Sequence, residues 1–278
     1  MDGSGTSRPS YSHELAIASL AARAAGQIAL GMQGGISSSA SIKADGSPVT
    51  PGDLAADQVI RHHLEMHFPE DAILSEELTD NAERLSHRRV WIIDPIDGTK
   101  DYVAGGDGWA VQLALAVDGR VVLGILDLPR CGVHLAGVVG IGATLVDENG
   151  SQNLIAGSAP LTTMIGSSST RNAASLVQIR AALPEFGFTS CTSVGVKVHR
   201  MLRGEADLYV HGRTIHEWDV AAPAAVLLAA GGMATALDGS ELAYNTPGGR
   251  CPGLVFSTRA DHPELIQRLR AAGLSANA

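Results

Sequence analysis

Residues 90–102 read Val90-Trp91-Ile92-Ile93-Asp94-Pro95-Ile96-Asp97-Gly98-Thr99-Lys100-Asp101-Tyr102. The first four are apolar and mostly β-branched, which predicts a buried strand. We expect the strand to stop at Asp94-Pro95, because proline has no N–H for a ladder and restricts the residue before it. Asp94 and Asp97 then flank a tight turn that closes on Gly98-Thr99.

The residues of this turn suit metal and phosphate chemistry. Two carboxylates at a strand end, with the backbone carbonyl of Ile96 between them, can hold a hard divalent cation through oxygen alone. Gly98 and Thr99 add N–H groups and a hydroxyl, which suit a phosphate oxygen or a metal-bound water. Taken alone, Asp-Pro-x-Asp-Gly is more typical of a polar turn, so the interpretation depends on the rest of the chain.

The bulk properties are those of a globular protein. The chain has 278 residues, of which 45% are hydrophobic and 18% charged, enough for one large domain or two. The net charge of −9 argues against a nucleic-acid polymer or an anionic membrane as partner, but a bound metal would still permit a small anionic substrate.

Cysteine usage and the N-terminus predict a cytoplasmic location. Cys131, Cys191 and Cys251 are too far apart for a disulfide framework or a zinc spacing. The first nine residues have no basic segment before an apolar core, and no apolar run approaches the ~20 residues that span a bilayer.

The pattern of elements predicts two halves. Residues 1–10 are expected to be disordered. Residues 11–157 read as an α+β half: helices over 11–32 and 51–67, then strands over 72–74, 90–93, 110–117, 121–128, 133–139 and 143–146. Asp118-Gly119 is a hairpin signal, and Thr50-Pro51 is a helix start. Residues 158–278 alternate strands (163–166, 187–190, 208–211, 254–257) with helices (173–182, 196–202, 220–230, 262–271), which predicts an α/β half.

Further acidic residues lie near predicted element ends. Glu76 and Glu77 follow a short strand, and Asp219 starts an apolar helix in Trp218-Asp219-Val220. Asp219 is either an N-cap or a carboxylate that closes a metal site, and its position alone favours the cap. His62, His63 and His67 share one helix, where a solvated face is the better interpretation.

These motifs together resemble the inositol monophosphatase superfamily of magnesium-dependent, lithium-sensitive phosphatases. The resemblance rests on Ser75-Glu76-Glu77, on residues 91–99 and on Trp218-Asp219-Val220-Ala221-Ala222 with the later Ala230-Gly231-Gly232, and it covers about residues 11–272. It implies a layered αβαβα sugar-phosphatase-like fold, with the metal site between the two halves, most ligands coming from the first half and the last ligand from the second.

The resemblance also implies a role for each matching residue. Glu76, Asp94 and the Ile96 carbonyl would hold one Mg²⁺, and Asp94, Asp97 and Asp219 a second, with a third ion left open. Asp53, in a threonine-x-x-aspartate pattern with Thr50, would work with Thr99 and the Glu76-bound ion to activate water. Gly98 and Thr99 would bind phosphate. Two such ions neutralise a dianionic ester and activate water without a protein nucleophile.

Several segments resemble the CysQ-type 3′(2′),5′-bisphosphate nucleotidases within this superfamily. They are residues 45–50, 97–102, 204–211, Glu217-Trp218-Asp219, 237–240 and Tyr244-Asn245. This predicts hydrolysis of 3′-phosphoadenosine 5′-phosphate, with Lys197 and Glu217 as substrate-binding residues. Lys197 would pair with a second phosphate, although a solvated helix lysine is an equally good interpretation.

Other substrates stay open at this point. Members that act on inositol phosphates tend to carry an acid seven positions before the last aspartate, where this chain has Gly212. Where the nucleotidases often have serine-arginine-serine-histidine, this chain has Ser167-Ser168-Ser169-Thr170, and Arg171 or Arg213 would have to replace the missing base. The alternative is an inositol-1-phosphatase-like or other sugar- or nucleoside-phosphate phosphatase. The roles of Glu77, His211 and His216, and the choice between monomer and homodimer, stay open too.

Overall fold

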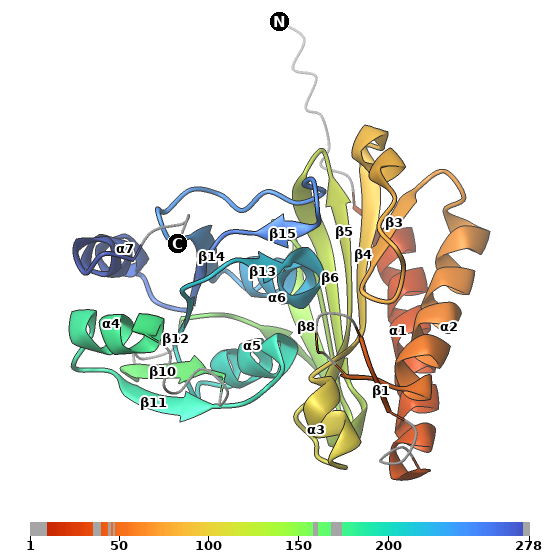
Figure 1. Cartoon of the computed structure of the whole chain (residues 1–278), viewed down its shortest axis with the longest axis horizontal. Coiled ribbons are helices and arrows are strands. Elements are labelled where there is room, and N and C mark those ends of the chain that lie inside the picture. Colours follow the sequence, from red (N-terminus) through yellow and green to blue (C-terminus); the bar gives the residue numbers. More distant parts are fainter. Residues whose placement is uncertain are drawn as a thin grey trace, which may run out of the picture.

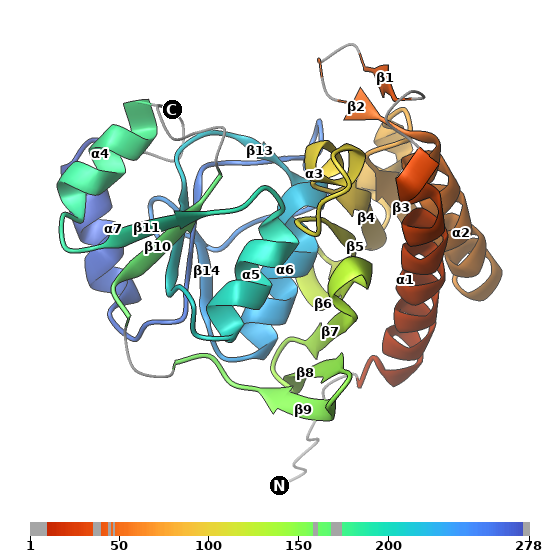
Figure 2. The ribbon, with the colours of Figure 1, turned by 90° about the horizontal axis from the view of Figure 1, so that it is seen from below.

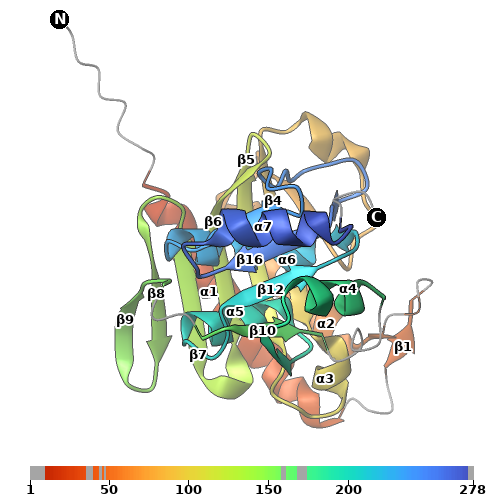
Figure 3. The same cartoon turned by 90° about the vertical axis from the view of Figure 1, so that its left-hand side faces the viewer.

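Five layers make up the computed structural model, which describes residues 10–35, 40–43, 46, 48–157, 161–167 and 174–274 (Figure 1). Helices α1 (Ser12–Met32) and α2 (Pro51–His67) cover a seven-stranded sheet. Helices α5 (Val194–Leu202) and α6 (Glu217–Ala229) separate it from a five-stranded sheet. Helices α4 (Ala174–Ala182) and α7 (His262–Ala271) form the outer layer (Figure 3). The predicted αβαβα fold is confirmed. Of residues 1–10, for which disorder was expected, residues 1–9 lie outside the described part and Ser10 lies within it.

The seven-stranded sheet has the order β3-β4-β5-β6-β7-β8-β9. Only β3 and β4 are parallel; the other neighbours are antiparallel, as their short connections require. Asp118 and Gly119 both have positive φ, which confirms the hairpin between β5 and β6. The strands are β3 (Ala72–Ser75), β4 (Arg89–Asp97), β5 (Ala110–Val117), β6 (Arg120–Leu128), β7 (Val133–Val138), β8 (Gly142–Asp147) and β9 (Gly150–Leu154).

The five-stranded sheet is mixed, with the order β11-β10-β12-β16-β14. Its parallel part confirms the predicted strand–helix alternation. The sequence missed β14, and it missed β9 because four of that strand's five residues are exposed and show no apolar alternation. The strands are β10 (Thr163–Gly166), β11 (Gly187–Ser190), β12 (Leu208–His211), β14 (Met233–Ala236) and β16 (Leu254–Ser257).

Helix α1 corrects one expectation from the sequence. By length and composition it could cross a membrane, although no run of that kind was expected. In the fold its small side chains are fully buried and let it pack closely on α2 and the sheet, so it is a core helix: Ala18, Ala21, Ala22, Ala25 and Ala29.

The strand through the quoted stretch runs further than predicted. β4 continues past Pro95 to Asp97, so the expected stop at Asp94-Pro95 is wrong. Asp94 pairs with Gln112 and Asp97 with Ala110, and the register shifts between these two pairs. Pro95 lies in this bulge, where no ladder hydrogen bond is required of it.

Helix α6 lies on a groove of glycines in the seven-stranded sheet. Gly124 of β6 and Gly137 of β7 are cross-strand partners. A Cβ at Gly124 would lie 2.6 Å from the Ala222 carbonyl oxygen, and one at Gly137 would lie 2.7 Å from the Ala229 Cβ. The missing side chains therefore set how closely α6 approaches the sheet.

We expect Gly124→Ala to lower the free energy of unfolding by about 1–3 kcal/mol, because the added methyl meets the backbone of α6. The matched control is Gly31→Ala on α1, where a Cβ meets nothing within 4 Å. There the change should be neutral or stabilising, since alanine is the better helix former. Urea unfolding of both variants measures the difference, and equal stabilities would show that α6 adapts to a bulkier sheet.

Candidate active site

Three carboxylates from both halves meet at the edge of the seven-stranded sheet. One oxygen each from Asp94, Asp97 and Asp219 lies within 4.8 Å of the others. Asp94 and Asp97 are buried at the end of β4, and Asp219 is half-buried in the first turn of α6. The helix that rests on the glycine groove thus brings the third carboxylate to the other two.

Glu76 reaches this edge because β3 and β4 are parallel. Ser75 pairs with Ile93, and the Glu76 N–H donates to the Ile93 carbonyl at 3.1 Å, so Glu76 leaves the sheet beside Asp94. Its charge contributes to the raised pKa values of Asp53, Asp94 and Asp219. The carboxylates that the sequence grouped therefore share one electrostatic environment.

Asp97 is held by the N-terminus of α5. Its Oδ2 accepts the Ser193 hydroxyl at 2.6 Å, the Val194 N–H at 2.6 Å and the Gly195 N–H at 3.1 Å. Ser193 is also the N-cap of α5, since its Oγ accepts the Val196 N–H. Helix N-termini favour anions, so this arrangement fixes one oxygen of Asp97. No hydrogen bond to Oδ1 occurs among the described residues.

Asp53 and Thr99 form a second polar group. Thr50 and Asp53 make a capping box at the predicted start of α2, in which Asp53 Oδ2 accepts the Thr50 N–H at 2.8 Å and the Thr50 hydroxyl at 2.6 Å. The Thr99 hydroxyl lies 3.5 Å from Asp53 Oδ1 and 3.1 Å from the Ile96 carbonyl oxygen. Burial raises the pKa of Asp53, and the bonds from Thr50 oppose that shift.

Gly98 precedes the short helix α3 (Thr99–Val103). It has φ 98°, and a Cβ there would lie 2.6 Å from the Gly108 carbonyl oxygen, so both conformation and space require glycine. Glycine at this position therefore lets the chain turn from β4 into α3 close to the backbone of Gly108 and Trp109.

Asp219 is not the helix cap that its position alone favoured. The cap residue is His216, and Asp219 is the third residue of α6, because the helix begins at Glu217 rather than Val220. Burial and the charges of Asp97 and Glu76 raise the pKa of Asp219 well above its ordinary value. A backbone hydrogen bond from His216 opposes this rise and is outweighed.

The electrostatics of the cluster fit a bound cation. Burial, then the neighbouring charges of Glu76, Asp97 and Asp219, raise the pKa of Asp94 well above its ordinary range. Gln112, the cross-strand partner of Asp94, is fully buried, and its amide N and O have no hydrogen-bond partner among the described residues. Oxygen ligands this close suit a hard divalent ion, which would offset their repulsion.

Glu77, whose role the sequence left open, has a side chain that is shielded from solvent. Its side chain is 4% exposed, and Lys43 donates to both Glu76 and Glu77. Burial raises the pKa of Glu77 to about 7 even though the Lys43 hydrogen bond lowers it.

Two predicted substrate-binding residues lie inside the protein. Lys197 is fully buried, and its Nζ donates to the carbonyls of Thr192 at 2.6 Å and Ser193 at 3.2 Å. Glu217 is fully buried and accepts from the backbone of Asn245 and Thr246. Direct substrate contact by either residue stays a prediction, and these hydrogen bonds favour a positioning role.

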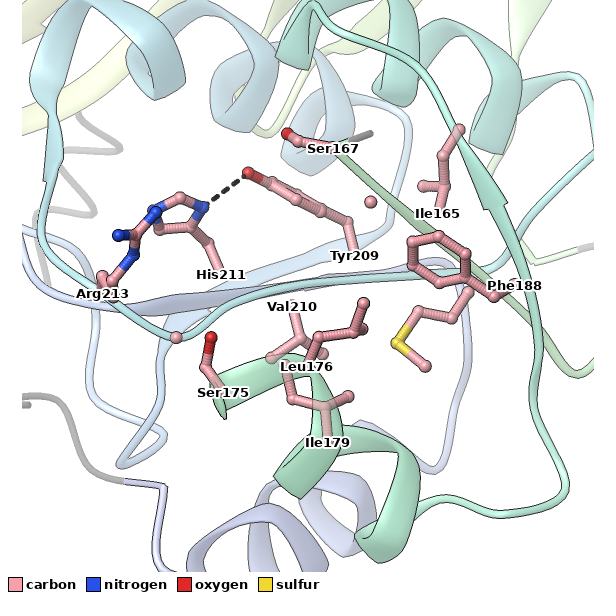
Figure 4. A pocket seen from close by; sticks show the side chains of 13 residues that line it. Ile165, Ser167, Ser175, Leu176, Ile179, Phe188, Tyr209, Val210, His211 and Arg213 are labelled. Carbon is pink, nitrogen blue, oxygen red and sulfur yellow. Dashed lines mark hydrogen bonds between the residues drawn. The ribbon is translucent and has the colours of Figure 1, made fainter. Parts of the chain in front are cut away.

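A pocket opens at the ends of β10 and β12 (Figure 4). Tyr209 lies between this pocket and the acidic cluster. On the pocket side, its hydroxyl lies 3.1 Å from His211 Nδ1. On the other side, burial and then the charges of Asp219 and Asp97 raise the pKa of Tyr209. Burial lowers the pKa of His211 to about 4, so His211 is neutral at pH 7. Arg213, at the rim, is exposed. His216 lies elsewhere, stacked on Trp218 at 4.2 Å.

Comparisons with known proteins decide the family. The profile of the inositol monophosphatase family matches residues 11–274. This chain belongs to the inositol monophosphatase family. It is therefore a phosphatase, and the family is metal-dependent.

Curated relatives point to one branch of the inositol monophosphatase family. A 3′-phosphoadenosine 5′-phosphate phosphatase of Mycobacterium bovis is 37% identical over 223 residues, 77% of this chain and 79% of that protein. The 3′(2′),5′-bisphosphate nucleotidase CysQ of Escherichia coli K12 is 31% identical over 207 residues, 73% of this chain and 81% of that protein.

Solved structures of this family share the fold. CysQ from Bacteroides thetaiotaomicron superposes with a TM-score of 0.76 at 23% identity, covering 90% of this chain and 99% of that one. An inositol monophosphatase from Anabaena superposes with a TM-score of 0.73 at 25% identity, covering 96% and 98%.

Sequence reasoning missed two side chains that contact the predicted metal ligands. Ser193 gives a recognisable cap signal before an apolar helix, but the sequence does not show that the same hydroxyl reaches Asp97, 96 residues away. Lys43 follows the short strand β1 (Ser41–Ile42), and nothing local signals its contact with Glu76.

Asp94→Asn should stabilise the metal-free protein and abolish its stabilisation by Mg²⁺. The pKa of Asp94 is higher in the folded protein than in the unfolded chain, so protonation of Asp94 favours folding. This stabilisation is fully present below about pH 4 and is lost as the pH rises through the folded-state pKa. At pH 7 in EDTA the variant should therefore melt about 2–4 °C higher than the wild type.

The matched control is Asp57→Asn, which also removes a buried carboxylate. Asp57 Oδ2 accepts from Arg61 at 2.6 Å, so this change should lower the melting temperature with and without Mg²⁺. Thermal melts at pH 5 and pH 7 test both. A Mg²⁺-dependent rise that survives in Asp94→Asn would contradict the assignment.

Proposed function

We propose that this chain is a Mg²⁺-dependent phosphomonoesterase that hydrolyses 3′-phosphoadenosine 5′-phosphate to AMP and phosphate. The observation that carries the chemistry is the convergence of Asp94, Asp97 and Asp219 within 4.8 Å, beside the Asp53–Thr99 pair. The branch is supported by the relatives at 31–37% identity. Lithium sensitivity and a cytoplasmic location belong to the same proposal.

In this proposal the carboxylates hold the ions. Glu76, Asp94 and the Ile96 carbonyl would hold one Mg²⁺, and Asp94, Asp97 and Asp219 would hold another. Bound Mg²⁺ would supply charge neutralisation of the phosphate dianion and a lower pKa for water. Ser193, Val194 and Gly195 restrain only Oδ2 of Asp97, which leaves its Oδ1 for a cation.

The remaining residues handle water and phosphate. The Thr99 hydroxyl would orient the attacking water and pass a proton towards Asp53, whose raised pKa makes it a better base. The water oxygen would bond to phosphorus as the bond from phosphorus to the 3′ oxygen breaks. The leaving oxygen would take a proton from solvent water, which balances the proton that Asp53 accepts. The N–H groups of Gly98 and Thr99, in the turn that follows the carboxylates, would bind phosphate oxygens.

The second half of the chain argues against an inositol phosphate. A Cβ at Gly212 would lie 2.7 Å from the Ser175 Cβ of α4, so the acid that inositol-specific members tend to carry there does not fit. The pocket beside Tyr209 has a neutral His211 and one arginine among its described lining residues. The exposed guanidinium of Arg213 suits a substrate with a second phosphate.

The direct test is phosphate release from 3′-phosphoadenosine 5′-phosphate, inositol-1-phosphate, histidinol phosphate, fructose-1,6-bisphosphate and AMP, with Mg²⁺, with added lithium and with EDTA. We expect kcat/KM for the 3′-phosphonucleotide to exceed that for each other substrate by at least about 100-fold, which corresponds to about 3 kcal/mol of tighter transition-state binding. Preference for a sugar phosphate would keep the metal chemistry and reject the branch. Equal rates in EDTA would reject the metal-dependent mechanism.

Arg213→Gln should raise KM for 3′-phosphoadenosine 5′-phosphate about tenfold, with little effect on 3′-AMP, because a charge-assisted hydrogen bond to the 5′-phosphate is lost. The matched control is Arg203→Gln, another exposed arginine that lies at the end of α5. Steady-state kinetics with both substrates measures the difference. Equal effects of Arg213→Gln on both would remove Arg213 from the 5′-phosphate.

A further inference from the structure

Lys43 makes a two-sided ion pair beside the acidic cluster. Its Nζ lies 2.9 Å from Glu76 Oε1 and 2.8 Å from Glu77 Oε1. Lys43 follows β1, which pairs with β2 (Pro48–Val49), and β2 lies next to α3 (Figure 2). Glu77 is 4% exposed and Lys43 21%, so the pair is shielded but the lysine remains within reach of water.

Glu76 thus has two candidate cations. It is the proposed ligand of one Mg²⁺, yet in this structure its Oε1 accepts from an ammonium group. A divalent ion bound to a carboxylate and an ammonium group on the same oxygen repel each other at a few ångströms. Even if the ion takes Oε2, the two cations lie a few ångströms apart, so each lowers the affinity of Glu76 for the other.

Glu77 keeps the lysine close without occupying the metal site. Its N–H donates to the Ser75 hydroxyl at 3.2 Å, which directs the residue away from the line of β3. Among the described residues, Lys43 is the cation that pairs with Glu77. Glu77 therefore gives Lys43 a partner that does not depend on Glu76.

We propose that Lys43 is an internal counter-cation that competes with the metal ion for Glu76, and that Glu77 retains Lys43 once the metal is bound. The proposal rests on the proposed function, since it takes Glu76 as a metal ligand. It makes Lys43 and Glu77 determinants of metal affinity, although neither is a ligand. It also gives Glu77 a role that the sequence left open.

The first test is calorimetric titration of the full-length, metal-free protein with Mg²⁺ in the absence of substrate. Lys43→Met should lower the Kd for Mg²⁺ about fivefold or more, because it removes a like charge a few ångströms from the bound ion. The matched control is Arg120→Met, which removes a positive charge from an exposed ion pair with Glu241 and should leave the Kd unchanged. A wild-type or raised Kd in Lys43→Met overturns the proposal.

A double-mutant cycle separates retention of Lys43 from the charge of Glu77 itself. Glu77→Gln should raise the Kd for Mg²⁺ in the wild type, since Lys43 then pairs with Glu76 alone. In the Lys43→Met background the same change should have a clearly smaller effect. Equal effects in both backgrounds overturn the role of Glu77, because they show that it acts through its own charge.

The two proposals fail in different ways. If the wild type takes up no Mg²⁺ under any condition, the proposed function fails, and so does the competition at Glu76. If the wild type binds Mg²⁺ and turns over substrate but Lys43→Met binds no tighter, only the counter-cation proposal fails. Thermal melts in EDTA confirm that each variant is folded, and Lys43→Gln serves as a second neutral variant.

Discussion

The hydrogen bonds to Asp97 Oδ2 tie the two halves of this protein together. One carboxylate oxygen from the end of β4 accepts a hydroxyl and two backbone N–H groups from the start of α5. Three such bonds to a buried anion satisfy a group that would otherwise be costly to bury. They fix α5 relative to the seven-stranded sheet, and α6 packs against α5. The position of Asp219 over the sheet edge therefore depends on the same contact.

The bulge in β4 gives the site its shape. A regular strand places neighbouring side chains on opposite faces, so residues three apart diverge. The register shift between Asp94 and Asp97 breaks this alternation and brings the two carboxylates to one cation-sized space. Pro95 lies where the ladder is already interrupted. Pro95, which suggested the end of the strand, instead lies in the bulge that brings the two carboxylates together.

The sequence predicted what local patterns determine. The helix start at Thr50-Pro51 and the Asp118-Gly119 turn are confirmed, and so is the layered fold, which the family resemblance implied. It failed where partners are distant. The Ser193–Asp97 bond joins residues 96 apart, and the extent of β4 depends on a bulge that only its neighbour β5 defines. Lys197 was expected at the surface or on a substrate, but two carbonyls and the Tyr209 ring, 5.3 Å from its Nζ, surround it inside the core.

The distribution of positive charge around the carboxylates explains why a cation suits one place in particular. Lys43 pairs with Glu76 and Glu77 on the outer side. On the inner side, burial raises the pKa of Asp97 and of Asp219, and the charge of the buried Lys197 opposes that rise. Within the described residues, neither Asp94 nor Asp219 forms an ion pair, and their pKa values are raised well above the ordinary range. Both lysines are held by other acceptors, Lys197 by backbone carbonyls and Lys43 partly by Glu77. The protein thus stabilises the rim of its acidic cluster with its own cations and leaves the centre to be neutralised by a ligand.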